Sequence, residues 1–338
     1  MTDKTQEFLE LLERIKNRKH GDNIDKIMEE MHEMLPAVEK NVLRDAAKIC
    51  SLGFDPFILV QTADFVAVAN GNEDKKLEYR ARELEKEIDL FHKLDLFPEN
   101  NEEDSETCFF YFKDEFHERI LQMLFPDEKM PEKICVPISD LFFVYGSTLI
   151  DLGDVDGAEN VLHAAVTWNL TDAATTFEYA ESLKMQGDME HFFVKTLSAW
   201  QISFTKEDVA RVFRNLAFFF AEQKDWQNAN INLALSSIYE HDEEKILREL
   251  EYIQENADVE LEELTQEMIE EYAKELELPI GPNPEILTLL DSYCSELHER
   301  GDYVKSLPYL QNLYDLTGEP EVKKIIKEIK SGKLKGKK

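Results

Sequence analysis

The chain has 338 residues, with 71 Asp and Glu against 38 Lys and Arg, so its formal net charge is −33. Apolar residues make up 43% of it and aromatic residues 10%, which is too rich for a disordered chain. With 12 Gly and 11 Pro it has too few turn residues for an all-β sandwich. We therefore expect a folded, mostly helical protein, whose acidic surface argues against nucleic-acid and anionic-membrane partners.

The first 130 residues are predicted to form helices without a repeating motif. Residues 107–125 are expected to be helical, although the run from Cys108 to Phe112 could begin as a strand. This region is either a set of diverged helical hairpins continuous with the following array or a separate helical domain, and both interpretations stay open. Apolar spacing indicates five earlier helices, over Lys4–Lys19, Asp22–Met34, Ala37–Leu52, Phe57–Ala69 and Glu73–Leu94.

A turn motif recurs in the second part of the chain, in steps of 34, 37 and 77 residues. A small residue lies seven positions before each turn, where it would let two helices pack closely. Each repeat is therefore predicted to be two helices joined by a tight turn. The four turns are Gly153-Asp154, Gly187-Asp188, Lys224-Asp225 and Gly301-Asp302, and the small residues before them are Gly146, Ala180, Ala217 and Cys294.

These residues and the 34-residue step resemble the tetratricopeptide repeat (TPR), most clearly over 139–241 and 287–318. The pattern also departs from the family, because Phe192 and Thr196 stand where Ala and Phe are usual. The resemblance implies an all-α, TPR-like α-solenoid of antiparallel helix pairs over residues 131–330, followed by a basic tail at 331–338. The residues that carry it best are Phe142, Tyr145, Gly146, Leu149, Ala158, Leu162 and Ala165.

Residues 242–278 occupy the place of a degenerate repeat and are the most acidic part of the chain. Apolar spacing predicts helices over Glu243–Asn256 and Val259–Leu276. Between Glu240 and Glu277 there are 16 acids and 3 bases. A final helix over Glu321–Lys330 is expected to cap the end of the array, as solenoids require.

The sequence motifs predict no enzyme, no cofactor and no metal site. No glycine-rich loop that would hold a nucleotide phosphate is present in the sequence. His117-Glu118 and His298-Glu299 begin like a zinc-protease motif, but Leu121 and Asp302 stand where the second His is required. The start shows no signal-peptide pattern and the four Cys are isolated, so we expect a cytoplasmic protein with reduced thiols.

The resemblance further implies a concave groove lined by the first helix of each pair. Arg211 and Arg214 are three residues apart and so share one helix face, where Arg can hold a carboxylate through two hydrogen bonds. The competing interpretation is that both Arg only pair with local acids. The family's inward positions fall on Asp140, Phe143, Ser147, Phe177, Glu181, Lys184, Arg211, Arg214, Phe218, Asp291, Ser295 and His298, and the partner-binding candidates among them are Phe143, Phe177, Arg211, Arg214 and Phe218.

The function expected from these observations is a non-catalytic scaffold or adaptor that binds a protein or peptide in the groove, through an acidic segment or a C-terminal carboxylate. The alternative is an acidic decoy or carrier that binds basic proteins or mimics nucleic acid. Salt separates the two, because a charge-driven partner loses affinity steeply with ionic strength. An activity whose site forms in three dimensions in the N-terminal half is a third possibility.

Overall fold

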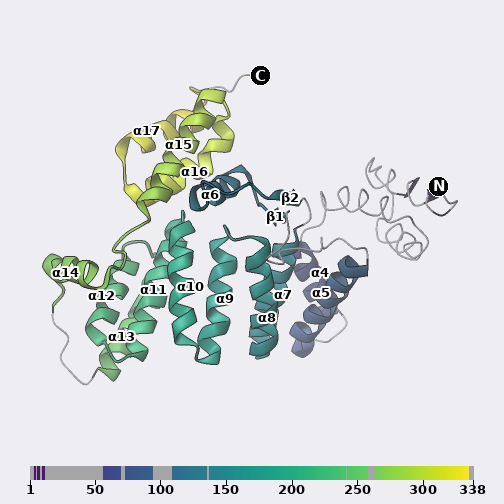
Figure 1. Ribbon diagram of the computed structural model, residues 1–338, viewed down its shortest axis with the longest axis horizontal. Helices are drawn as coiled ribbons and strands as arrows, with labels where there is room; N and C mark the ends of the chain where they lie inside the picture. Colours follow the sequence, from purple (N-terminus) through teal and green to yellow (C-terminus); the bar gives the residue numbers. More distant parts are fainter. Residues whose placement is uncertain are drawn as a thin grey trace. The chain divides into compact units, whose positions relative to one another are not determined.

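The computed structural model describes residues 56–69, 73–93, 109–134, 137–240, 242–257 and 263–334, with the helical residues 4, 6, 7, 10 and 11. Over these residues the chain is all-α, as predicted, apart from one two-stranded sheet (Figure 1). The helices expected at 22–34 and 37–52, and most of the one at 4–19, lie outside the described residues.

The chain divides into two compact units. The first contains residues 1–113 and 127–169, and the second contains residues 114–126 and 170–338. The boundary that we predict at residue 130 follows the repeat motif and stays a prediction.

The first unit contains four described helices that share one buried cluster. Its helices are α4 (Pro56–Ala69), α5 (Lys76–Lys93), α7 (Ile138–Leu152) and α8 (Val155–Trp168), with a 3-10 turn η2 (Glu73–Lys75) before α5. Arg80 of α5 donates two hydrogen bonds to Asp64 of α4, at 3.0 and 2.7 Å. The buried cluster consists of Leu84, Ile88, Phe91, Ile138, Leu141, Phe142, Val144 and Ala165.

This unit also contains a short parallel strand pair, β1 (Phe109–Tyr111) and β2 (Glu132–Ile134), in which Phe110 lies opposite Lys133. Of the two alternatives for residues 107–125, the strand start is therefore correct. The helix of that stretch, α6 (Glu115–Leu124), begins after Asp114, whose side chain accepts hydrogen bonds from the amides of Phe116 and His117.

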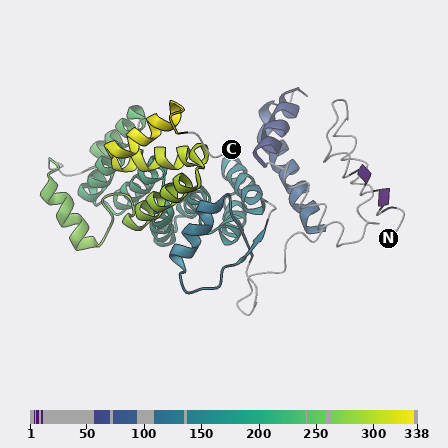
Figure 2. The same ribbon diagram turned by 90° about the horizontal axis from the view of Figure 1, so that it is seen from above.

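The second unit combines α6 with helices that follow one another along the chain. Figures 1 and 2 both show α6 beside α15 (Pro284–Arg300) and α16 (Tyr303–Thr317). The remaining helices are α9 (Ala173–Gln186), α10 (Met189–Ile202), α11 (Lys206–Glu222), α12 (Trp226–Ser237), α13 (Glu243–Asn256), α14 (Gln266–Leu276) and α17 (Pro320–Lys330).

The recurrent turn has the same backbone geometry at each position. Its first residue is in the left-handed region, which favours glycine, and it ends the preceding helix. At three of the turns the following Asp then caps the next helix with its side chain. The left-handed residues are Gly153 (φ 79°), Gly187 (φ 79°), Lys224 (φ 61°) and Gly301 (φ 84°).

The small residue before each turn sets how closely two helices approach. A Cβ atom added to Gly146 of α7 would lie 2.4 Å from Leu162 Cγ of α8, so no larger residue fits at this helix spacing. Ala180, Ala217 and Cys294 are likewise buried. The close-packing role is therefore confirmed for Gly146, and the burial of the other three agrees with it.

Three helices predicted after residue 240 can be compared with the structure, and α13 (Glu243–Asn256) has the predicted bounds. Helix α14 begins at Gln266, not at Val259, because Thr265 is non-helical and its hydroxyl accepts from the amide of Met268. Residues 258–262 lie outside the described residues. Helix α17 begins at Pro320, which confirms the expected final helix. Among the described helices, none combines the length and apolarity that a bilayer crossing requires.

Candidate functional site

A cavity of about 440 Å³ opens in the second unit between α9, α11 and α13. Its wall contains four cations and two acids, in a chain where acids outnumber bases almost two to one. We call it the cationic groove. Its lining consists of Glu181, Lys184, Arg211, Arg214, Asn215, Ala217, Phe218, Ala221, Arg248, Glu249, Tyr252 and Ile253.

Three of the five predicted partner-binding residues, Arg211, Arg214 and Phe218, line this groove. Phe177 is 1% exposed, and the guanidinium carbon of Arg211 lies 4.9 Å from the centroid of its ring. The expectation that Phe177 contacts a partner is therefore wrong. Its ring packs against the guanidinium of Arg211 and is too buried for a partner to reach. Phe143 belongs to the first unit, where it packs half-buried against the core cluster of that unit.

Both predicted arginines are paired with acids, as the competing interpretation of the sequence expects. Arg211 Nη2 donates to Glu178 at 2.9 Å. Arg214 Nη1 donates to Glu240 at 2.7 Å, and its Nε lies 3.9 Å from Glu249. Burial lowers the pKa of Arg214, although Glu249 and Glu240 oppose this. The side chain of Arg214 is 11% exposed, so little of it can reach a partner. Its ion pairs connect α11 to the segment after α12 and to α13.

The accessible part of the groove has cations and aromatic rings side by side. Lys184 Nζ lies 2.6 Å from Glu181 and 4.9 Å from the centroid of Phe218. Arg248 is exposed, and its Nε donates to a backbone carbonyl of its own helix. Within the part of the chain that the structure describes, its two terminal nitrogens make no ion pair. Tyr252, one turn further along α13, is 47% exposed.

No sequence motif indicates Arg248 or Tyr252 as site residues. They lie in the hairpin without a repeat motif, so no family position pointed to them. Their i, i+4 spacing on a predicted helix is a signal that they share a face. Nothing in that spacing shows that the face points toward α11.

A carboxylate with an unusual pKa lies one turn before Arg211. Burial raises the pKa of Asp208 to about 6, and repulsion from Asp172 and Glu207 adds to this. The hydroxyl of Thr205, which donates to Asp208 at 2.7 Å, acts in the opposite direction. Asp208 is therefore an acid with a raised pKa, one helical turn from Arg211 of the groove.

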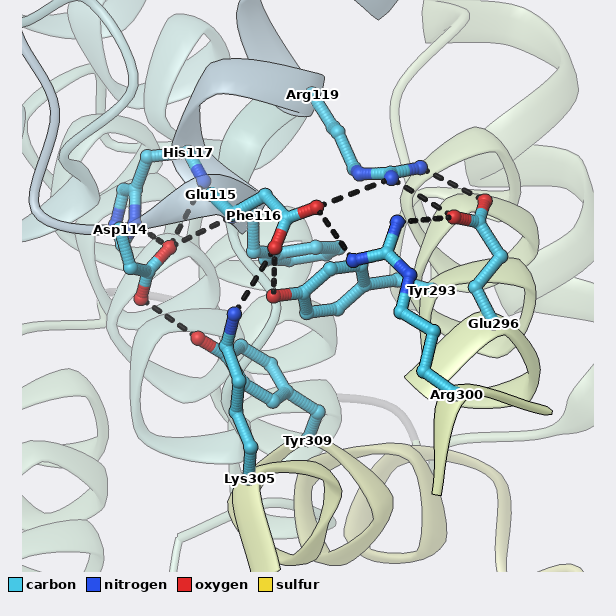
Figure 3. A network of polar contacts seen from close by, with 10 residues as sticks. All are labelled: Asp114, Glu115, Phe116, His117, Arg119, Tyr293, Glu296, Arg300, Lys305 and Tyr309. Atoms are coloured by element: carbon cyan, nitrogen blue, oxygen red, sulfur yellow. Dashed lines mark hydrogen bonds and ion pairs between the residues drawn. The ribbon is translucent and has the colours of Figure 1, made fainter. Parts of the chain in front are cut away.

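A second polar cluster lies where α6 meets α15 and α16 (Figure 3). Glu115 accepts hydrogen bonds from Lys305 at 2.9 Å, from Arg300 at 3.1 Å and from Arg119 at 3.3 Å. These cations, Lys305 foremost, lower the pKa of Glu115 to about 2. Arg119 also donates two hydrogen bonds to Glu296, both at 2.8 Å.

In the same cluster one Asp contacts both a His and a Tyr. Asp114 lies 2.8 Å from His117 Nδ1 and accepts from the Tyr309 hydroxyl at 2.7 Å. Burial favours the protonated carboxyl, but His117 and Tyr309 outweigh it and hold the pKa of Asp114 well below its ordinary value. His117 is 6% exposed, so this arrangement stabilises α6 and has little access to a substrate.

The described residues contain no group of three or more His, Cys, Asp and Glu that could hold a metal ion. The buried thiol of Cys294 is a poor nucleophile, because burial raises its pKa to about 12. A scan against protein-family models and a search of curated proteins both give no match for the chain.

Proposed function

We propose that this protein is a non-catalytic adaptor of TPR-like helical repeats that binds a protein segment in the cationic groove. The observation that carries the proposal is the grouping of Lys184, Arg211 and Arg248 with the rings of Phe218 and Tyr252 in one cavity of a strongly acidic chain. As part of the same proposal, the protein acts in the cytoplasm and needs no cofactor or metal.

The groove has hydrogen-bond donors that a carboxylate can use. Among the described residues, Arg211 makes its ion pair through Nη2, which leaves Nη1 and Nε for a ligand. Over the same described residues, the two terminal nitrogens of Arg248 make no ion pair, so they too can bind a ligand. A guanidinium binds a carboxylate through two parallel hydrogen bonds, which adds geometric specificity to the charge attraction. We therefore infer that the bound segment has an acidic side chain or a C-terminal carboxylate.

The aromatic rings and the surrounding acids restrict what else binds. Phe218 and Tyr252 supply area for an apolar side chain of the partner, and large rings of this kind often contribute most of the binding energy. The acidic surface elsewhere on the chain repels an acidic partner. Such a partner is therefore expected to bind in the groove and not at other places on the surface. Glu181 and Glu249 inside the groove repel an acidic segment, so a segment that has negative charge but no apolar side chain is expected to bind weakly.

The experiment is a peptide-display selection against the immobilised full chain at moderate salt, followed by measurement of Kd for the selected peptides. Peptides with an acid beside an apolar residue are expected. The double variant Arg211→Ala/Arg248→Ala should weaken their binding at least tenfold. Arg82→Ala, an exposed Arg of the first unit, is the matched control and should leave Kd unchanged. Peptides that bind the double variant as well as wild type would contradict the proposal.

The acidic carrier remains a second candidate, supported by a different surface. Around α14, six Glu side chains are exposed, and none of them forms an ion pair within the described residues. A basic protein bound there would lose affinity steeply as salt rises and would ignore the groove variants. The six residues are Glu263, Glu267, Glu270, Glu271, Glu275 and Glu277.

A further inference from the structure

Helix α6 is held in the second unit as a bound peptide helix would be. Only residues 114–126 of that stretch belong to this unit, and the flanking residues belong to the first. Phe116 and Ile120 are fully buried in the core of the second unit, and Met123 and Leu124 pack against it. These positions follow the i, i+4, i+7 spacing of a helix that binds in an apolar groove.

The anchor of α6 is one aromatic ring enclosed by three others. The centroid of Phe116 lies 4.9 Å from that of Phe204, 5.3 Å from Tyr293 and 5.4 Å from Tyr309. Tyr293 and Tyr309 meet edge to face at 5.0 Å. A buried aromatic side chain in a closely fitting pocket is the feature that dominates most peptide and protein interfaces.

Charges at the start of α6 fix its direction on this surface (Figure 3). The acids belong to α6, and their partners Arg300, Lys305 and Tyr309 belong to α15 and α16. Asp114 also caps the helix, so the Asp-Glu-aromatic start both forms the helix and complements the surface. The charged contacts remain open to solvent, because the side chains of Arg300 and Lys305 are each 47% exposed.

We propose that the α15–α16 surface is a receptor for a partner helix that begins Asp-Glu-aromatic, and that α6 is its competitor within the chain. The partner helix has an acidic first turn, an aromatic residue that fits between Phe204, Tyr293 and Tyr309, and apolar residues four and seven positions after that aromatic residue. It binds when α6 leaves, so its apparent affinity depends on the population in which α6 is released. This surface is distinct from the cationic groove, so the inference does not depend on the proposed function.

The test uses the full chain and a fluorescent peptide that spans Phe112 to Pro126. Phe116→Ala in the chain removes the internal anchor and leaves the receptor side chains unchanged. We expect the peptide to bind the Phe116→Ala chain at least tenfold more tightly than wild type. A peptide with Ala in place of Phe116 should not bind, and adding Lys305→Glu to the Phe116→Ala chain should reduce the gain. Equal peptide affinity for wild type and Phe116→Ala overturns the inference.

A second variant decides the question if Phe116→Ala loses its native circular dichroism. Glu115→Lys weakens only the solvent-exposed end of the α6 contact and leaves the aromatic anchor in place. The Glu115→Lys chain is expected to bind the wild-type peptide more tightly than the wild-type chain does. A folded Glu115→Lys chain that binds the peptide no better than wild type shows that α6 is a fixed part of the fold, and the inference fails.

Discussion

The cationic groove and the α6 contact are built from the same ingredients, yet one is open and the other is filled. In each, a cation lies over an aromatic ring, Arg211 over Phe177 and Arg119 over Tyr293. In each, acids neutralise the cations. The difference is the ring of Phe116, which fills an aromatic box at the α6 contact. The groove has Phe218 and Tyr252 on its wall and a cavity where an anchor would lie.

This difference indicates which kind of interaction keeps a segment bound at each site. Exposed ion pairs contribute less than about 1 kcal/mol each, so they orient a bound segment without holding it. Burial of one large aromatic side chain contributes roughly 1.5–3 kcal/mol and is the larger effect. The following variants measure that distinction, from the largest expected effect to the smallest.

The largest effect is expected for Phe116→Ala, which empties the aromatic box. The free energy of unfolding should fall by about 3–5 kcal/mol, because the side chain is fully buried and its neighbours cannot all collapse into the space. Denaturant titration measures this. Phe125→Ala, at an exposed ring just after α6, is the matched control and should change the unfolding free energy by less than about 0.5 kcal/mol. A loss below about 1 kcal/mol at Phe116 would show that the charges hold α6.

A smaller loss is expected for Asp114→Ala, about 2 kcal/mol, because the helix cap and the acceptor for the Tyr309 hydroxyl are both removed. The loss should depend on pH. Since the pKa of Asp114 is lowered in the folded state, its contribution is complete above the ordinary carboxyl pKa and disappears as pH falls below it. A loss that stays constant down to strongly acidic pH would contradict this reading.

Beside the groove, Asp208→Asn should change stability in the opposite direction. Because the pKa of Asp208 is raised in the folded state, its ionisation lowers the free energy of unfolding progressively as pH rises from 3.8, and the loss is complete above about pH 6. The amide keeps an acceptor for Thr205, so the variant should be more stable than wild type by on the order of 1 kcal/mol at pH 8. The gain should vanish below the ordinary Asp pKa of 3.8. Equal gains at both pH values would exclude ionisation as the cause.

The smallest effect is expected for Glu115→Gln, a loss of less than about 1 kcal/mol at neutral pH, since its ion pairs are exposed to solvent. Because Lys305 and the two Arg lower the pKa of Glu115 to about 2, wild type should lose its advantage as pH falls from about 4.5 toward 2. Thermal unfolding across that range measures it. A loss as large as that of Phe116→Ala would reverse the order of the two contributions.

The helix pairs were predictable because few residue types can make their turns and contacts. A left-handed residue followed by Asp ends one helix and starts the next, and the sequence shows this at each recurrent turn. Gly146 was readable as a close-packing position, and the 2.4 Å distance to Leu162 gives the reason. Lys224 shows the limit of such patterns, because it adopts φ 61° without being Gly.

The site was less predictable, because its parts come from elements with no shared motif. Arg211, Arg214 and Phe218 lie one turn apart on α11, and that spacing was visible. The contribution of α13 depends on how a hairpin without the repeat pattern packs against α11. Phe177 is buried in the core cluster of the second unit, and the local spacing on α9 does not show which of its faces that core covers. The α6 contact joins residues more than 170 positions apart, and local sequence patterns do not determine such pairs.

The central claim, that the cationic groove holds a protein segment, is tested most directly by photo-crosslinking from inside it. Tyr252→benzoylphenylalanine places the crosslinker in the groove at a side chain that is 47% exposed, and Val304→benzoylphenylalanine places it at an 81% exposed position on α16, outside the groove lining. The account predicts that position 252 crosslinks one acidic segment from native lysate, that position 304 does not, and that Arg211→Ala/Arg248→Ala abolishes the product. The same products from both positions, unchanged in the double variant, would contradict it.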